Sequence, residues 1–105
     1  MKSSKVKKIW KEGGLALGPL IKSIDPVHSE ILSQMDFDFL WYDLEHSDKS
    51  VETFANLARA TRVGDVDILA RPARWEYMRM ARLMEAGAQG IMYPRCESVE
   101  EAKDV

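Results

Sequence analysis

The chain has 105 residues, of which 46% are hydrophobic and 30% charged, a composition typical of one small folded domain rather than of a disordered segment. Its 15 basic and 17 acidic residues give a net charge of −2, which offers no electrostatic basis for binding nucleic acid or an anionic membrane surface. No apolar run is long enough to span a membrane, and no apolar signal core follows the basic N-terminus. The single Cys96 cannot form an internal disulfide. We therefore expect a cytoplasmic protein.

The first third of the chain predicts a helix, a strand and a second helix. Residues 5–12 have helical spacing of apolar side chains, and Gly13-Gly14 ends that helix. The apolar stretch 15–21 predicts a first strand. Asp25-Pro26 is a helix start, with the aspartate as N-cap and the proline at the first helical position. Four apolar residues are expected to form the buried face of this helix: Val27, Ile31, Leu32 and Met35.

Residues 37–46 combine a buried strand with a polar exit. Residues 39–42 are apolar on both faces, which is typical of a strand covered on both sides in a parallel sheet. Three titratable residues follow at once: Asp43, Glu45 and His46. An apolar strand that ends in such groups indicates one wall of an active site.

The rest of the chain continues the alternation. After the polar turn 47–50 comes a helix that ends near Gly64, then a short third strand over residues 67–70. A third main helix is expected over 74–86, and Gly87 has the position of a left-handed C-cap. The apolar faces of these two helices are expected to contain Val51, Phe54, Ala55 and Ala58 in one, and Tyr77, Met80, Ala81 and Met84 in the other.

A fourth strand and the start of a last helix complete the pattern. The strand is expected over residues 89–93, where Pro94 stops it. Ser98 and Glu101 form a capping box, and the helix that they open has barely two turns. We also expect Trp75 and Tyr77 to pack between helix and sheet.

A leading helix followed by four strand–helix units indicates an α/β fold with a parallel sheet. Two architectures are compatible with it: a doubly wound open sheet, and a (β/α)8 TIM barrel, which typically needs about 250 residues. Four units are half of such a barrel. We therefore expect residues 1–105 to be a fragment, or the product of a truncated gene.

In either architecture the functional groups lie where the strands end. The second strand delivers Asp43, Glu45 and His46, and the third delivers Arg71. An imidazole, carboxylates and a guanidinium at one edge can form an acid–base pair beside an anion clamp. Asp43 could also act by holding His46 in one tautomer. The alternatives without a role in catalysis or binding are a solvated or capping histidine for His46 and a structural ion pair for Arg71. Two further strand-end residues are weaker candidates, with a rim ion pair expected for Arg95 and no sign of a desolvated Schiff-base lysine at Lys22.

Three segments together resemble the HpcH/HpaI aldolase family, the metal-dependent pyruvate aldolases. Residues 37–46, FDFLWYDLEH, resemble its GFD(F/W)-apolar-D-x-E-H signature. Residues 68–72, ILARP, resemble its apolar-x-R-P strand, and residues 84–95, MEAGAQGIMYPR, its GAQGI-x-x-P segment. Each segment is moderately specific, and their order and spacing make the resemblance strong.

The resemblance implies a TIM barrel with its site at the carboxyl ends of the strands. It implies that His46 is the catalytic acid–base, that Asp43 works with it, and that Arg71 binds the 2-oxo acid and stabilises the enolate. Glu45 would act indirectly, through metal-bound water. The implied reaction is a reversible, metal-dependent retro-aldol cleavage of a 4-hydroxy-2-oxo acid to pyruvate and an aldehyde, without a Schiff base. The metal would be Mg²⁺ or Mn²⁺, and the full-length protein a homo-oligomer with a small-molecule substrate.

The sequence departs from the family in three respects. Met35-Asp36 replace a small Ala-Gly pair, and Leu20 replaces an aromatic residue found in some members. The family's metal ligands, a Glu and an Asp on the fifth and sixth strands, are expected beyond Val105, so no ligand is expected within this chain. Two alternatives stay open: a non-catalytic half-barrel that acts only by association with a partner chain, and a related lyase acting on CoA esters.

Overall fold

The computed structural model describes residues 3–105; Met1 and Lys2, which begin the basic N-terminal segment, lie outside the described residues. After a leading helix, strands and helices alternate. In chain order they are α1 (Lys5–Lys11), β1 (Leu20–Ile21), α2 (Pro26–Ser33), β2 (Phe39–Asp43), α3 (Val51–Thr61), β3 (Asp67–Arg71), α4 (Tyr77–Ala86), β4 (Gly90–Ile91) and α5 (Val99–Asp104). The strands form one parallel sheet in the order β1-β2-β3-β4, which confirms the predicted fold class.

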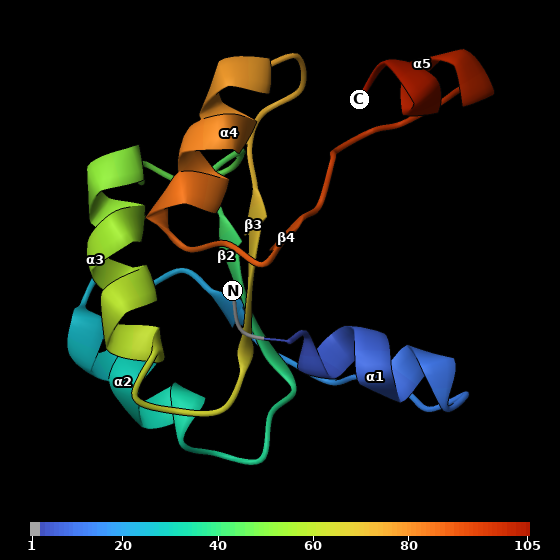
Figure 1. The fold of residues 1–105 in the computed structure, drawn as a ribbon. Helices are drawn as coiled ribbons and strands as arrows, with labels where there is room; N and C mark the ends of the chain where they lie inside the picture. The colour runs from blue at the N-terminus through green and yellow to red at the C-terminus, as the bar shows by residue number, and fades with distance from the viewer. Residues whose placement is uncertain (1–2) are drawn as a thin grey trace.

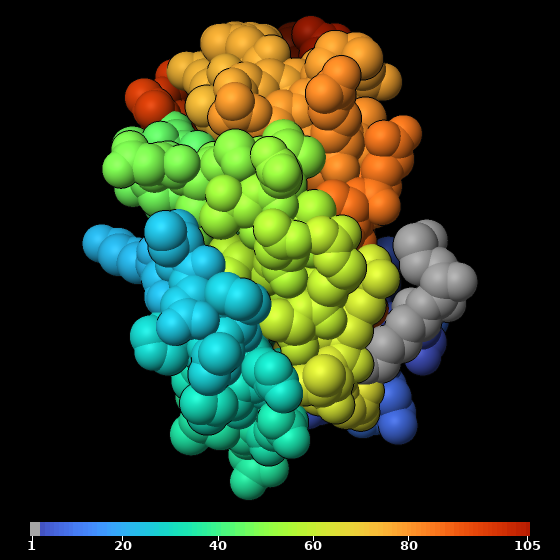
Figure 2. Space-filling model, turned by 90° about the vertical axis from the view of Figure 1, so that its left-hand side faces the viewer, coloured from blue at the N-terminus to red at the C-terminus, as the bar shows by residue number. Residues whose placement is uncertain are grey.

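The core lies between this sheet and three helices. Helices α2, α3 and α4 lie on one side of the sheet, whereas α1 lies near its lower end and α5 stands apart from the helical layer (Figure 1). The three helices pack beside one another, with α3 between α2 and α4 (Figure 2). Alternate residues of the two central strands face this layer and are buried: Leu40, Tyr42, Ile68 and Ala70.

The opposite face of the sheet is less covered than expected. Phe39, Trp41 and Leu69 alternate with the core residues and are only half-buried. Within residues 3–105, the helical layer thus covers one face of β2 rather than both. On the covered face, the Tyr42 ring packs edge-on against Phe54, with ring centroids 5.6 Å apart.

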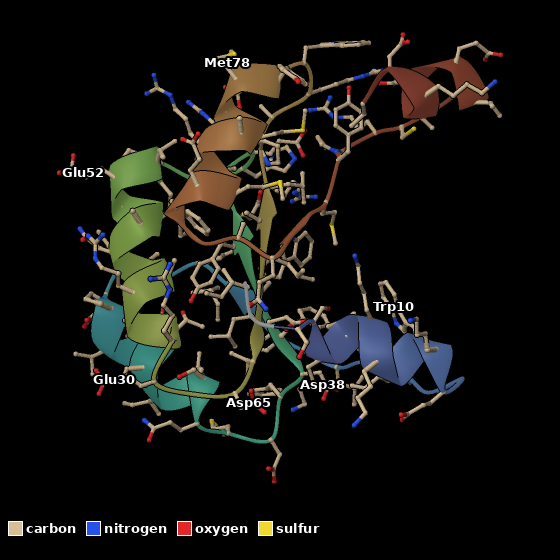
Figure 3. The ribbon with its side chains drawn as sticks, viewed as in Figure 1. Trp10, Glu30, Asp38, Glu52, Asp65 and Met78 are labelled. Carbon is tan, nitrogen blue, oxygen red and sulfur yellow. The ribbon has the colours of Figure 1, made fainter. Side chains whose placement is uncertain are left out.

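Asp67 fixes α1 to the sheet. Its buried carboxylate, at the start of β3, accepts hydrogen bonds from the backbone amides of Lys5 and Val6 at 3.1 and 2.9 Å. The Ser4 hydroxyl donates to the same carboxylate at 2.5 Å, and the side-chain amide of Gln89 donates to it at 3.1 Å. The start of α1 and the entry to β4 therefore meet on one carboxylate. Beyond this anchor α1 carries the exposed Trp10, labelled in Figure 3.

The predicted N-cap and C-cap residues are confirmed, but the reciprocal half of the predicted capping box is not: the Glu101 carboxylate accepts from the Glu97 amide at 3.1 Å instead of the Ser98 amide. Asp25 accepts from the Val27 amide at 2.9 Å, with Pro26 at the first helical position, and Ser98 accepts from the Glu101 amide at 3.0 Å. Gly87 caps α4 with a φ of 124°, a conformation that residues with a Cβ rarely adopt.

The two edge strands are shorter than predicted. β1 is confined to Leu20–Ile21 rather than residues 15–21, and β4 to Gly90–Ile91 rather than residues 89–93. Within residues 3–105 each pairs with one neighbour only, and Pro19, which has no backbone N–H to donate, directly precedes β1. Helix α4 also begins later than expected, at Tyr77, after a turn in which Trp75 has a φ of 69°.

The predicted apolar face of α2 is wrong except at Leu32, which is half-buried and packs against the core. Val27, Ile31 and Met35 are exposed, whereas Ser29 and Ser33 are buried. Small side chains let this helix approach its neighbours closely: a Cβ placed on Gly64, after α3, would lie 1.8 Å from the Ser33 carbonyl oxygen. Close backbone contact, rather than apolar periodicity, therefore decides which face of α2 is buried.

The predicted face of α4 is also wrong. Leu83 is its buried residue, while Tyr77, Ala81 and Met84 are exposed. Trp75, expected between helix and sheet, is 69% exposed. In contrast, α3 buries Phe54 and Ala58 as predicted.

No helix of the described residues 3–105 has the length and apolar character needed to cross a membrane.

Candidate active site

A two-point contact at the strand ends joins Asp43 to Arg71. The two residues are register partners on β2 and β3, so their side chains leave the same face of the sheet. Nε of Arg71 donates to Oδ1 of Asp43 at 3.0 Å and Nη2 to Oδ2 at 2.7 Å. These hydrogen bonds are the main reason that the pKa of Asp43 is lowered to about 2. The sequence expectation that both side chains meet at one edge is confirmed.

Asp43 also orders the loop that follows β2. Its Oδ1 accepts from the backbone amides of Glu45 and His46 at 2.9 and 3.3 Å, and the Ser47 hydroxyl donates to its carbonyl oxygen. Asp43 thus bonds His46 through the backbone amide, whereas the imidazole lies 3.5 Å from Oε2 of Glu45. The structure supports positioning of the histidine by way of the loop rather than by a direct contact with the ring.

Glu45 connects three strand ends. Oε1 of Glu45 accepts from Nε and Nη2 of Arg95 at 3.0 and 2.5 Å, and these bonds are the main reason that its pKa is lowered. Its Oε2 lies 3.5 Å from Nε of Arg71 and 3.5 Å from Nε2 of His46. The Glu45 side chain is only 4% exposed. The ion pair expected for Arg95 is confirmed, and its partner is a residue of the candidate site.

His46 and Arg71 differ in how far they are accessible. The His46 side chain is 63% exposed, so its imidazole can reach a bound ligand. Arg71 is 21% exposed and stacks over the Trp41 ring, with its Cζ 4.8 Å from the ring centroid. Asp43 raises the pKa of Arg71. Of the five N–H donors of this guanidinium, two bind Asp43, which leaves three for an anion.

Lys49 is a residue of this region that the sequence did not single out. It is buried, and its Nζ donates to the Lys22 carbonyl oxygen at 3.0 Å and to the Ser47 hydroxyl at 3.4 Å. Burial lowers the pKa of Lys49. It thereby joins the end of β1 to the loop that carries His46. Nothing in the order of residues distinguishes this lysine from a solvated one. Lys22, the weak Schiff-base candidate, is exposed.

The described residues do not fit a metal site. Within 3–105, no three His, Cys, Asp or Glu side chains come together as a set that could hold an ion. The two carboxylates at the strand ends, Asp43 and Glu45, are each engaged by an arginine. Any divalent ion at this edge would therefore need ligands from outside these residues.

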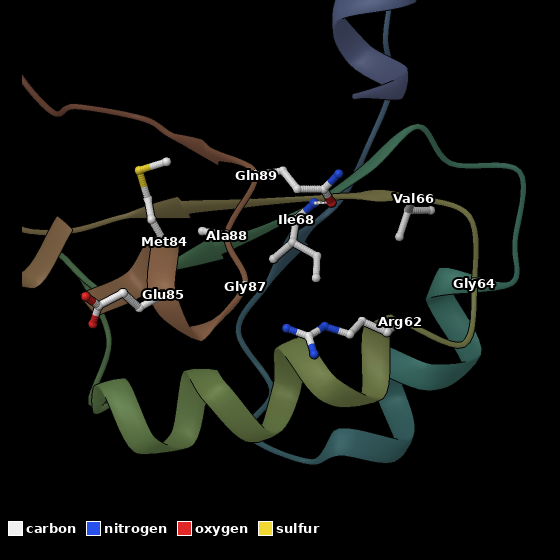
Figure 4. A pocket seen from close by; sticks show the side chains of 9 residues that line it. All are labelled: Arg62, Gly64, Val66, Ile68, Met84, Glu85, Gly87, Ala88 and Gln89. Carbon is white, nitrogen blue, oxygen red and sulfur yellow. Dashed lines mark hydrogen bonds between the residues drawn. The ribbon is translucent and has the colours of Figure 1, made fainter. Parts of the chain in front are cut away.

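The cavity in Figure 4 lies at the other end of the sheet. Its walls include Arg62, Gly64 and Val66, which precede β3, and Gly87 and Gln89, which precede β4. In parallel-sheet enzymes the chemistry is placed at the carboxyl ends of the strands. This cavity is therefore separate from the cluster of Asp43, Glu45 and Arg71.

Comparisons with known proteins show that the chain is similar in sequence and fold to aldolases. A hydroxypyruvate/pyruvate aldolase from Rhizorhabdus wittichii is 28% identical over 100 residues, which cover 95% of this chain and 40% of the relative. A pyruvate aldolase from Rhizobium etli is 32% identical over 75 residues, 71% of this chain and 30% of the relative. A solved HpcH/HpaI aldolase/citrate lyase family protein from Burkholderia cenocepacia is 26% identical and superposes with a TM-score of 0.85 over 95% of this chain and 40% of its own.

The chain is homologous to the HpcH/HpaI aldolase family. No protein-family model matches it. The chain spans about 40% of the length of the first of these relatives, and its four parallel strands correspond to part of the TIM barrel of the HpcH/HpaI aldolases. The fold and the family expected from the three segments are thus confirmed. Which of the clustered residues act in catalysis stays a prediction.

Proposed function

We propose that the full-length protein carrying this sequence is a pyruvate aldolase that cleaves a 4-hydroxy-2-oxo acid reversibly to pyruvate and an aldehyde. The observation that supports it best is the joining of Asp43, Glu45, His46 and Arg71 at the carboxyl edge of the sheet, in a chain homologous to named pyruvate aldolases. Residues 1–105 are proposed to be the N-terminal half of the barrel. The relatives' names support a small-molecule substrate.

Arg71 is proposed to bind the carboxylate of the 2-oxo acid. Asp43 holds two of its N–H donors and Trp41 supports its flat face, so the remaining donors keep a fixed direction. A guanidinium fork matches the geometry of a carboxylate. The same fixed positive charge stabilises the negative charge that develops on the enolate oxygen when the carbon–carbon bond breaks.

His46 is proposed to act as the acid–base. In the cleavage direction its imidazole accepts the proton of the 4-hydroxyl group, directly or through water, as the bond between C3 and C4 breaks. In the synthetic direction it returns that proton to the new alkoxide. The exposed ring next to the buried Glu45 suits a group that must reach a substrate and carry a transient positive charge.

The family resemblance implies a divalent ion, Mg²⁺ or Mn²⁺. Since residues 3–105 do not fit such an ion, we assign its ligands to other parts of the full-length protein. A homo-oligomeric state of the full-length protein is also proposed from the family resemblance.

One experiment tests the proposal. The full-length protein is incubated with pyruvate and propanal, with Mg²⁺, with Mn²⁺ or with EDTA, and the mixture is examined by NMR for the 4-hydroxy-2-oxo acid. We expect the product with an added ion and its loss with EDTA. Absence of any product across both ions and a panel of aldehydes would refute the aldolase assignment. Product formation that resists EDTA would refute metal dependence.

A second candidate rests on the open sheet. In the part of the chain that the structure describes, β1 and β4 each have one unpaired edge, and the face that carries Phe39, Trp41 and Leu69 is only half-buried. Open edges favour pairing with further strands. This supports the alternative that the 105-residue chain, if it exists as such, acts only in association with a partner chain. A purified 105-residue chain that is monomeric and unfolds cooperatively would exclude that alternative.

A further inference from the structure

Arg95 is held in an unusual conformation in the loop that follows β4. It follows Pro94 and has a φ of 54°, a left-handed conformation that is costly for a residue with a side chain. Its side chain is 60% exposed, yet it does not extend freely into solvent. It reaches a residue 50 positions earlier in the chain, Glu45 in the loop after β2.

The contact uses only one oxygen of Glu45. Both Nε and Nη2 of Arg95 donate to Oε1, at 3.0 and 2.5 Å. The second oxygen, Oε2, is left between Nε of Arg71 and Nε2 of His46, 3.5 Å from each. Neither of these two longer contacts is a hydrogen bond, and the one with Arg71 is an ion pair. Arg95 therefore makes the short hydrogen bonds with Glu45, whose other oxygen faces Arg71 and His46, the two groups proposed to act on the substrate.

The burial of Glu45 decides what loss of Arg95 would do. An exposed ion pair contributes little, because water replaces either partner. The Glu45 side chain is only 4% exposed while Arg95 lies against it, so loss of Arg95 would leave its carboxylate without a hydrogen-bonded cation. The nearest cation is Arg71. Glu45 would then shift toward the Arg71 guanidinium and compete with a substrate carboxylate for it.

We propose that Arg95 is a positioning residue: it fixes Oε1 of Glu45 and so keeps Arg71 available to the substrate carboxylate. The inference rests on the proposed function, since it concerns the same site. Arg95 itself need not touch the substrate. It acts through Glu45, and its contribution therefore depends on the negative charge of Glu45.

This dependence gives a sharp test by a double-mutant cycle. In the full-length protein with its divalent ion, KM for pyruvate and kcat are measured for condensation with propanal. The proteins compared are the wild type, Arg95→Met, Arg95→Lys, Glu45→Gln and the double variant Arg95→Met/Glu45→Gln. Propanal carries no charge, so a direct contact of Arg95 with an acidic aldehyde cannot contribute.

We expect Arg95→Met to raise KM for pyruvate by about tenfold or more, on the typical contribution of hydrogen bonds to charged groups, with a smaller fall in kcat. Arg95→Lys keeps the charge and should restore most of the affinity. In the Glu45→Gln background, Arg95→Met should change KM by less than about twofold, because no buried charge is left to capture Arg71.

Arg74 offers a matched control. Its guanidinium also pairs with a buried carboxylate, with Nε and Nη2 each 2.9 Å from an oxygen of Glu101, but it contacts none of Asp43, Glu45 or Arg71. Arg74→Met should lower stability by a similar amount and leave KM for pyruvate within about twofold. Thermal unfolding of each variant identifies any that fails to fold. If Arg95→Met does not fold, the KM values of Arg95→Lys and of the double variant still test the inference.

Three results would overturn the inference. An equal rise in KM with and without the Glu45 charge would show that Arg95 acts on the substrate directly. A rise in KM for pyruvate in Arg74→Met as large as that in Arg95→Met would show that a general loss of stability is the cause. A KM in Arg95→Met like that of the wild type would show no positioning at all. These outcomes differ from failure of the proposed function, in which the wild type itself forms no product and both proposals fall.

Discussion

Asp43 and Arg71 form a two-point contact between neighbouring parallel strands, with N···O distances of 3.0 and 2.7 Å. The pair does two things at once. It ties the ends of β2 and β3 together, and it aims the guanidinium at the edge where the loops carry Glu45 and His46. Its consequences for stability and for binding can be measured separately.

The stability contribution of Asp43 should depend on pH. Its pKa lies at about 2 in the folded protein, below its ordinary value of 3.8, so the unfolded chain takes up the proton first as the pH falls. The contribution is complete above about pH 4, on the order of 2 kcal/mol, and is lost as the pH falls through 2. Urea unfolding of the wild type and of Asp43→Asn should thus differ most above pH 4 and converge toward pH 2. A difference that stays constant from pH 6 to pH 2 would contradict the assigned role of the ionised pair.

Replacing Arg71 by lysine should harm binding although it keeps the charge. A lysine cannot reproduce the two-point contact with Asp43 and still present a fork to a carboxylate. We expect KM for pyruvate to rise by about 10- to 100-fold, the equivalent of one or two charged hydrogen bonds. Steady-state kinetics measures this, with Arg79→Lys as the control, since Arg79 pairs only with Glu76 among the described residues. Equal KM values in Arg71→Lys and the wild type would remove Arg71 from the binding site.

Replacing His46 by alanine should lower the rate without loss of stability. Removal of an acid–base group typically reduces kcat by about 10²- to 10⁴-fold. Because the side chain is 63% exposed, the free energy of unfolding should change by less than about 0.5 kcal/mol. The control is His28→Gln, since His28 is the other histidine and bonds to the Ser23 hydroxyl through Nδ1 at 2.7 Å. If both variants keep full activity, the acid–base assignment is wrong.

Asp67 should matter for the fold rather than for the reaction. Its buried carboxylate accepts the amides of Lys5 and Val6, so Asp67→Ala leaves these donors without a partner. We expect a loss of about 2–4 kcal/mol in the free energy of unfolding. Hydrogen exchange at residues 5–8 should also accelerate. The control is Asp36→Asn, at an exposed position before β2, which should change neither quantity. Unchanged exchange in Asp67→Ala would show that α1 is held by other contacts.

The parts of the fold that local chemistry decides could be predicted from the sequence. Asp25, Gly87 and Ser98 act where their side chains or backbone conformations require. The continuous apolar run of β2 identified a parallel sheet, and parallel strands bring their carboxyl ends to one edge. That rule alone was enough to bring Asp43 and Arg71 together.

The parts that depend on the neighbours of an element could not be predicted. The apolar face of α2 turns outward because Ser29 and Ser33 allow a closer approach to the next element. The burial of Lys49 depends on the Lys22 carbonyl, which no local pattern indicates. Arg95 could be recognised as an ion-pairing residue, but its partner, Glu45, follows only from the three-dimensional arrangement.

The most direct test of the central claim is a crystal structure of the full-length protein with its divalent ion and oxalate, a stable mimic of the pyruvate enolate. The account predicts that a carboxylate of oxalate lies within about 3 Å of the Arg71 guanidinium, with Asp43 still bound on its other side and the His46 ring facing the ligand. Oxalate bound away from the strand ends, with Arg71 contacting Asp43 alone, would contradict it.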